Sequence, residues 1–156
     1  NQSMRAQGRD RLLDEGIANN VTYLQADAEQ LPMPDNTVNS ITMAFGLRNV
    51  TRKEIALASM LRILKPGGRL VVLEFSQPKN DLLKNAYDKF SGLWPKIGKT
   101  LTGDESSYRY LVESIKMHPD QETLKQMMQN AGFVKCEYHN ILNGIAAIHV
   151  GRKART

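Results

Sequence analysis

A strand, a helix and a second strand follow one another between residues 38 and 75, and this run constrains the fold more than any other feature. Residues 38–45 are largely apolar and residues 69–75 nearly all apolar, which is typical of strands buried on both faces of a sheet. Between them, residues 52–64 place Ile, Leu and Ala side chains on or near one face of a helix. Two such strands joined by a helix predict a parallel α/β sheet.

Local signals mark the ends of this helix. Thr51 can cap its first turn, because a threonine oxygen accepts from the free N–H groups there. The run KPGG at residues 65–68 stops the helix, since proline disfavours a helical residue before it and glycine permits a tight reversal. We assign this run a geometric role and no chemistry.

The remaining segments predict shorter elements and one irregular region. In chain order these are a helix over 3–15 ended by Gly16, a strand over 21–25, a proline-rich loop over 31–36, a helix from Asp120 to Asn130, and two strands over 134–142 and 145–151. Asn143-Gly144 joins the last two strands, and this dipeptide is a strong hairpin signal. Residues 76–117 mix aromatic and lysine side chains, and we expect irregular helices there that cross one end of the sheet as a lid.

Composition sets outer limits on function. The 156 residues are 41% hydrophobic and 24% charged, which suits one globular domain over residues 1–156. No apolar run approaches the roughly 18 residues that span a bilayer. The net charge of +5 owes three units to Arg152, Lys153 and Arg155, a terminal cluster that is a weak indicator of anionic partners. No nucleic-acid-binding module accompanies it, so we expect no nucleic-acid partner.

Cysteine and histidine usage points away from disulfide and metal chemistry. The single cysteine, Cys136, excludes an intramolecular disulfide and fits a reducing compartment. Its place in a predicted strand favours a buried, inert thiol. No cluster of His, Cys and carboxylates has metal-ligand spacing, so we predict no metal site.

Two segments after predicted strands carry candidate chemistry. Asp27 and Ala28 follow the strand over 21–25, at the sheet edge where α/β proteins bind ligands. The Asp27 carboxylate can accept from an exocyclic amine such as that of adenine, and the Ala28 N–H can donate to a ring nitrogen. The alternative is that Asp27 only caps the next turn.

Arg48 and Asn49 follow the strand over 38–45 and place a fixed cation and an amide beside the same crevice. An arginine is always charged and can stabilise an oxyanion. The alternative is a structural arginine paired with an acid of the following helix. His118, in a turn before Pro119, is either a base or proton relay or a structural cap.

Several motifs in a fixed order resemble one family. They are LPMPDN at 31–36, FGLRNVT at 45–51, LKPGGRL at 64–70, LEFS at 73–76, SYRYLVESI at 107–115 and MHPDQETL at 117–124. Together they resemble the ubiquinone/menaquinone biosynthesis C-methyltransferases (the UbiE family), which are class I S-adenosylmethionine-dependent enzymes. The likeness runs from Asn1 to about Gly151.

This resemblance implies a function and a set of site residues. The family methylates a ring carbon of a polyprenylated benzoquinol or demethylmenaquinol with S-adenosylmethionine as cofactor. It implies that Asp27 and Ala28 bind the adenine, and that Ala44 lies where many members have a serine that contacts the cofactor. The missing hydroxyl leaves only a backbone contact at Ala44. Arg48 is the candidate for stabilising the phenolate of the acceptor, with Asn49 orienting it.

The resemblance also implies that part of the architecture is absent. The family resembles other class I enzymes in having a Gly-rich loop after its first strand and an acid after its second, and neither appears in this sequence. We therefore expect a Rossmann-like sheet without strands 1 and 2, with a helical lid and a C-terminal antiparallel hairpin. Without those strands, residues 21–25 lose their normal neighbour and residues 38–45 become an apolar edge, which favours pairing with another chain.

Partners and location follow from the same resemblance. We expect a polyprenylated quinol substrate, peripheral membrane contact through the lid, and a homodimer or other quinone-biosynthesis proteins as partners. The expected location is cytoplasmic, with membrane association, or the matrix side of the mitochondrion in a eukaryote. The alternative function is a non-catalytic module, derived from such an enzyme, that binds a quinone lipid or a partner.

Overall fold

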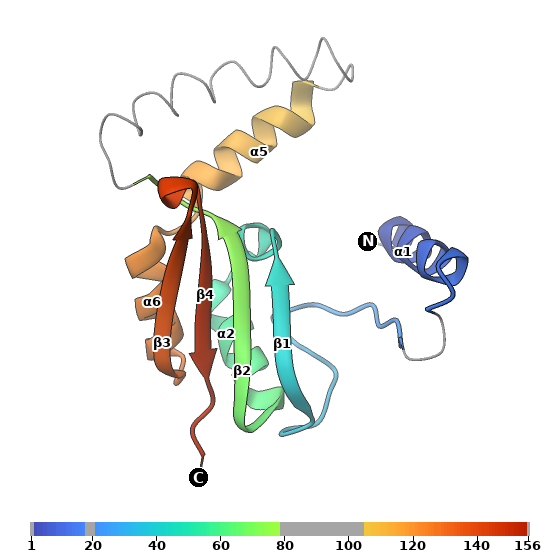
Figure 1. Ribbon diagram of the computed structural model, residues 1–156, viewed down its shortest axis with the longest axis horizontal. Helices are drawn as coiled ribbons and strands as arrows, with labels where there is room; N and C mark the ends of the chain where they lie inside the picture. Colours follow the sequence, from blue (N-terminus) through green and yellow to red (C-terminus); the bar gives the residue numbers. More distant parts are fainter. Residues whose placement is uncertain (1, 18–20, 79–104, 156) are drawn as a thin grey trace.

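Four strands form one mixed sheet in the computed structural model, which describes residues 2–17, 21–78 and 105–155. The strand order is β1-β2-β4-β3 (Figure 1). The family that the sequence resembles usually has the strand order 3-2-1-4-5-7-6, and this order without strands 1 and 2 predicts the observed arrangement of the last four strands. The predicted α/β fold class is therefore confirmed.

The strands combine one parallel pair with a C-terminal hairpin. β1 (Val38–Ala44) runs parallel to β2 (Leu64–Phe75). β4 (Ala146–Arg152) runs antiparallel to both β2 and β3 (Val134–Ile141). The carboxyl ends of β1 and β2 consequently meet at one edge of the sheet, where ligands bind in open α/β folds.

The strand expected over residues 21–25 is wrong. These residues form no strand, and Val21 and Leu24 are exposed by 39% and 58%. A strand needs a hydrogen-bonding neighbour, and the sheet offers this segment none.

The first strand of the sheet is an edge strand, as predicted from the absence of strands 1 and 2. Full burial of residues 38–45 is wrong, however, because every residue of β1 is half-buried or exposed. An apolar run that suits a central strand thus lies at an edge of the sheet.

Two helices cover one face of the sheet and enclose the core with it (Figure 1). They are α2 (Lys53–Ile63) and α6 (Gln121–Asn130). The buried core side chains come from these helices, from β2 and from the segments beside them: Leu47, Ala56, Leu57, Met60, Leu64, Leu70, Val72, Leu124, Met128 and Phe133. From Gly68 on, buried residues of β2 alternate with more exposed ones, and Leu70 and Val72 point into this core.

Both ends of α2 differ from the prediction. Thr51 does not cap the helix; the N-cap residue is Arg52, and its N–H donates to Oε1 of Glu29 at 2.9 Å. A carboxylate from a distant turn therefore binds the N–H of the residue that precedes the helix, and the N-cap side chain makes no capping hydrogen bond. At the other end, β2 begins at Leu64, so the KPGG run at 65–68 belongs to the strand and coincides with a register shift against β1.

The C-terminal elements agree with the prediction. Asp120 caps α6, because its side chain accepts from the N–H of Thr123. β3 and β4 form an antiparallel hairpin whose connection contains the short helix η3 (Leu142–Gly144). Asn143 and Gly144 have φ values of 55° and 97°, the left-handed backbone that this dipeptide favours.

Three further helices complete the described chain. α1 (Gln2–Asp14) matches the predicted N-terminal helix and lies away from the sheet in Figure 1. The short helix η2 (Leu47–Asn49) follows β1. α5 (Glu105–Met117) contacts η2 and crosses the upper end of the sheet in Figure 1, as predicted for the last part of the lid. Residues 79–104 of the predicted lid lie outside the described residues.

Candidate functional site

Arg48 is held at the carboxyl edge of the sheet by a buried carboxylate. Its Nη1 atom donates to Oε1 of Glu74 at 2.9 Å, and its backbone N–H donates to Oε2 of the same residue at 3.2 Å. Nη1 also donates to the carbonyl oxygen of Phe45. Charge-assisted contacts of this kind fix the guanidinium in one orientation.

Glu74 is the functional residue that the sequence reasoning missed. It lies near the end of β2 and is only 1% exposed. The structural alternative for Arg48 named an acid of the following helix, whereas the acid belongs to the next strand. The signal was present in the LEFS motif, because an acid inside an otherwise apolar strand needs a buried partner.

Two aromatic rings complete the support for the arginine. Phe45 follows β1 and Phe75 ends β2, and their ring centroids are 4.8 Å apart. The guanidinium carbon of Arg48 lies 5.6 Å from the centroid of Phe75, within range of a cation–π interaction. The last residues of two parallel strands therefore position one cation at their shared edge.

A groove of about 320 Å³ lies between this edge and α5. The segment after β1 and the helix line it together, through Arg48, Asn49, Val50, Thr51, Lys53, Tyr110, Glu113, Ser114 and Met117. The Tyr110 hydroxyl donates to Oδ1 of Asn49 at 3.0 Å and so links the two walls. Both residues predicted to be catalytic, Arg48 and Asn49, therefore face one cavity.

The predicted adenine-binding residues lie in a tight turn. Oδ1 of Asp27 accepts from the N–H of Glu29 at 2.9 Å, so the capping alternative is realised in the structure. Asp27 is exposed, whereas Ala28 is half-buried against the core. The capping bond uses one carboxylate oxygen and leaves the other available to a ligand.

Glu29 joins this turn to the start of α2. Its Oε2 atom lies 2.7 Å from Nε of Arg52, and its Oε1 atom accepts from the Arg52 N–H. These hydrogen bonds, the backbone one first, lower the pKa of the Glu29 carboxyl from its ordinary value. The turn is thereby fixed next to the segment that follows β1. Ala44, the third predicted cofactor residue, is the last residue of β1 and is exposed.

His118 and Ser76 are buried polar residues that directly follow α5 and β2. His118 is 4% exposed, and neither ring nitrogen has a hydrogen-bond partner in the described part of the chain. Burial, helped by the positive charge of Lys53, lowers the pKa of His118 to about 4. Ser76 is 3% exposed, and its Oγ atom likewise lacks a described partner. His118 is thus a neutral imidazole at physiological pH, and its ring makes no capping hydrogen bond to the described residues.

The other two histidines divide between core and surface. His149 on β4 is buried, and its Nε2 atom lies 2.9 Å from the carbonyl oxygen of Gln121. Burial lowers the pKa of His149. His139 on β3 is exposed.

Cysteine and metal chemistry play no visible part in the described chain. Burial raises the pKa of the half-buried Cys136 thiol, which disfavours the reactive thiolate. Among residues 2–17, 21–78 and 105–155, no three His, Cys or acidic side chains are grouped to hold a metal ion. The same residues contain no helix with the length and apolar character of a bilayer span.

Solved structures share this fold at low sequence identity. A crystal structure of the cyclase SpnF covers 99% of this chain and 65% of its own, with a TM-score of 0.73 and 18% identity. A SAM-dependent methyltransferase from Aquifex aeolicus covers 97% of this chain and 64% of its own, with a TM-score of 0.65 and 16% identity. These likenesses identify the fold as that of class I methyltransferases.

Relatives of much higher identity carry one name. The ubiquinone/menaquinone biosynthesis C-methyltransferase UbiE of Azotobacter vinelandii is 64% identical over 98% of this chain, and that of Teredinibacter turnerae is 61% identical over 99%. The chain spans about 60% of the length of these curated relatives. The model of the ubiE/COQ5 methyltransferase family matches residues 1–153, and the chain belongs to that family.

Proposed function

We propose that this chain is the larger part of a single methyltransferase domain that transfers a methyl group from S-adenosylmethionine to a ring carbon of a polyprenylated benzoquinol or demethylmenaquinol. The observation that carries the proposal is the Arg48 guanidinium, held by Glu74 at the carboxyl edge of the sheet and facing a groove beside Asn49. Family membership and the names of the relatives support the same reaction.

The residues present fit the adenine end of S-adenosylmethionine. The Asp27 carboxylate is exposed, and among residues 2–17, 21–78 and 105–155 only its Oδ1 atom is used, by the N–H of Glu29. Its second oxygen can accept from the exocyclic amine, and the Ala28 N–H can donate to a ring nitrogen. Ala44 offers backbone contact at the end of β1. When bound, the cofactor supplies an electrophilic methyl group.

In this proposal Arg48 acts on the acceptor. A ring carbon becomes nucleophilic when the neighbouring hydroxyl loses its proton, and a fixed cation stabilises the resulting phenolate. No described residue accepts a hydrogen bond from Nη2 of Arg48, so that edge of the guanidinium is available to the oxyanion. Asn49, held by Tyr110, orients the acceptor ring. The proton that leaves the methylated carbon passes to solvent in the groove.

Calorimetric titration with S-adenosylmethionine separates this function from a non-catalytic quinone-binding module. Micromolar binding that Asp27→Ala weakens supports the methyltransferase. Transfer of a labelled methyl group to a short-tailed demethylmenaquinol then tests Arg48 directly. We expect Arg48→Ala to lower the rate by at least a hundredfold, about 2.7 kcal/mol of transition-state stabilisation, with cofactor affinity unchanged. Binding of quinol without the cofactor would instead support the binding module.

The membrane and subunit partners belong to the same proposal. Tyr110 and Met117 of α5 are exposed by 57% and 84%, and they flank the groove. An apolar rim at the mouth of a quinol site gives the polyprenyl tail a path and allows contact with a lipid surface at the inner face of a bacterial membrane. The unpaired edge of β1 is the surface on which a second chain can add a strand. Flotation with liposomes and sedimentation velocity test these two contacts separately.

A further inference from the structure

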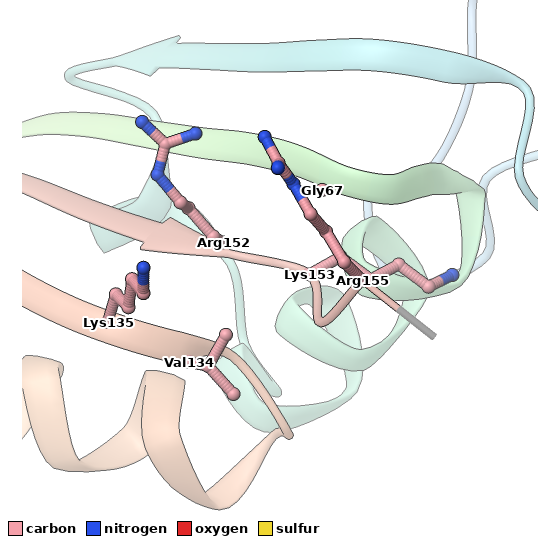
Figure 2. A pocket seen from close by; sticks show the side chains of 6 residues that line it. All are labelled: Gly67, Val134, Lys135, Arg152, Lys153 and Arg155. Carbon is pink, nitrogen blue, oxygen red and sulfur yellow. The ribbon is translucent and has the colours of Figure 1, made fainter.

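A second pocket lies at the other end of the strands from the groove, where β2 begins and β4 ends. Its volume is about 440 Å³, and its lining is rich in cations: Gly67, Val134, Lys135, Arg152, Lys153 and Arg155 (Figure 2). From this lining we propose that the pocket binds a phosphate group, carried either by a soluble molecule or by a phospholipid head group. This inference does not depend on the proposed methyl transfer.

Three of these cations lack an acidic partner. In the described part of the chain, no carboxylate pairs with Lys135, Arg152 or Arg155. Figure 2 shows their side chains extending from β3, β4 and the segment after β4 in the same general direction. Concentrated positive charge without a counter-charge raises the free energy of the folded chain, and a bound anion removes that cost.

The strand register strengthens this argument. Arg152 on β4 lies directly opposite Arg69 on β2. Directly opposed residues of an antiparallel pair share one face of the sheet, and like charges in such positions repel each other. In the described part of the chain no carboxylate pairs with either arginine, so an anion bound at Arg152 would relieve this repulsion.

The backbone positions of the other cations are also specified. The ladder between β3 and β4 shifts register between Val134 and Glu137, and Lys135 within this bulge has a φ of 51°. Bulges redirect side chains, and this one turns Lys135 into the pocket beside Val134. A left-handed backbone is uncommon for lysine, which sets this residue apart from an ordinary surface lysine.

The segment after β4 is fixed to the sheet rather than free. The Gly67 N–H donates to the carbonyl oxygens of Lys153 and Ala154 at 3.1 and 3.3 Å, and the Lys153 N–H donates to Gly68 at 2.8 Å. Nζ of Lys153 binds Oδ1 of Asn36 at 2.8 Å and so holds this lysine to one side. Arg155 packs so closely over Gly67 that a Cβ there would lie 3.1 Å from its Nε atom. The Arg155 side chain is exposed and lies against the backbone of Gly67.

The chemistry of the donors favours phosphate over other anions. Planar guanidinium groups offer paired N–H donors that match two oxygens of a phosphate, and a lysine adds a point charge. Two arginines and one lysine suit a group that carries up to two negative charges. Val134, exposed by 42%, supplies an apolar wall for the organic part of the ligand.

Two probes distinguish the sources of the phosphate. Inorganic phosphate is titrated into the full chain by calorimetry at pH 7.5, with sodium chloride at equal ionic strength as the reference. Flotation then compares vesicles of phosphatidylcholine with vesicles that also contain phosphatidylglycerol. Phosphate binding without vesicle capture indicates a soluble ligand, and capture that depends on phosphatidylglycerol indicates a lipid head group.

Substitutions of the pocket residues test whether the phosphate binds in this pocket. We expect the double substitution Arg152→Ala and Arg155→Ala to weaken binding at least tenfold, while Arg11→Ala, which removes the same type of charge from exposed α1, leaves it unchanged. Lys135→Asn removes the third charge, and asparagine tolerates the left-handed backbone at this position. This variant therefore tests the pocket if the double variant does not fold. The proposal would be overturned if these variants bound the probes as tightly as the parent chain does. It would also be overturned if the parent chain bound neither probe above the chloride reference.

Thermal unfolding gives an independent readout. Phosphate should raise the melting temperature of the chain and leave that of the double variant unchanged, because only a ligand of the folded state stabilises it. Without phosphate, Arg152→Ala should melt at a higher temperature than the parent chain, since it relieves the repulsion with Arg69. A lower melting temperature of Arg152→Ala would show that repulsion between the two arginines does not destabilise the folded chain. That result would count against an anion site.

Discussion

Nη1 of Arg48 lies 2.9 Å from Oε1 of Glu74, and this ion pair joins the segment after β1 to the end of β2. Both side chains are largely removed from solvent, with exposed fractions of 13% and 1%. Breaking a buried pair by deleting one partner leaves an uncompensated charge. We therefore expect Glu74→Ala to lower the free energy of unfolding by about 3 kcal/mol, measured by urea denaturation.

A matched series separates charge from shape at this position. Glu74→Gln keeps the volume and one acceptor oxygen, so it should cost about 1 kcal/mol. Glu15→Gln, which alters an exposed acid beyond the end of α1, should change stability by less than about 0.5 kcal/mol. If Glu74→Ala were as mild as Glu15→Gln, the ion pair would contribute nothing to stability and Arg48 would be held by Phe45 and Phe75 alone.

The strands of the sheet could be predicted from the sequence because each carries its own signal, whereas their order followed from the resemblance to the family. β1 and β2 are apolar runs on either side of a helix, and Asn143-Gly144 marks the hairpin. Residues 21–25 have the composition of a strand, and yet they form none, because a strand needs a neighbour and local composition does not reveal whether one is present.

Only part of the candidate site could be predicted in the same way. Arg48 and Asn49 follow a strand, and their position in the sequence places them at the ligand edge. Glu74 is 26 residues away from Arg48, and no local pattern states which buried acid meets which arginine. Likewise, Glu29 reaches the N–H of Arg52 at the start of α2 from a distant turn, and Thr51 is not the N-cap residue. Contacts of long sequence separation decide these details.

The hydrogen bond from Tyr110 to Asn49 predicts a contribution of α5 to catalysis. Tyr110→Phe removes the 3.0 Å bond and keeps the ring, so Asn49 loses the contact that orients its amide. In the proposed reaction we expect kcat to fall about threefold to tenfold, a change of roughly 0.7–1.4 kcal/mol in the barrier. Stability should hardly change, because Tyr110 is 57% exposed. Steady-state methyl transfer and thermal unfolding measure the two effects.

Tyr108 provides the control for this substitution. It lies on the same helix and is half-buried, and its hydroxyl has no hydrogen bond in the described part of the chain. Tyr108→Phe should leave kcat unchanged. An equal loss of kcat in the two variants would point to a general disturbance of α5. It would mean that the hydrogen bond to Asn49 does not contribute to the rate.

The lowered pKa of His118 predicts how the stability of the chain depends on pH. Burial lowers its pKa in the folded chain to about 4, whereas the unfolded value is near 6.5. Between these values the unfolded chain binds more protons, so stability is complete above pH 6.5 and falls as the pH drops toward 4. The loss attributable to this residue is at most about 3 kcal/mol. His149, whose pKa is also lowered by burial, adds a loss of the same sign.

Replacing His118 by leucine tests that assignment. Neither ring nitrogen has a hydrogen-bond partner among the described residues, so His118→Leu removes a costly polar group without leaving another unpaired. We expect stability at pH 7 to be unchanged or higher, and the slope between pH 6.5 and 4.5 to become shallower. Urea midpoints at four pH values measure the slope. An unchanged slope would mean that another group titrates there.

The last prediction concerns the close approach of β1 to β2 at Gly68. A Cβ at this position would lie 2.8 Å from the carbonyl oxygen of Lys65 and 3.0 Å from that of Asn39. Both atoms belong to the backbone, so neither moves aside without disturbing the ladder. Gly68→Ala should therefore lower the free energy of unfolding by about 2 kcal/mol, as overpacking does elsewhere.

The effect of Gly68→Ala should be concentrated in the edge strand. In the described part of the chain β1 pairs with β2 alone, so loss of this contact should speed hydrogen exchange in β1 before it affects β3 and β4. Gly8→Ala is the control, because a Cβ at that position in α1 meets nothing within 4 Å and alanine favours helix. It should slow exchange in α1 and leave β1 unchanged. Uniformly faster exchange in all four strands of the Gly68 variant would show that β1 does not open independently of the sheet.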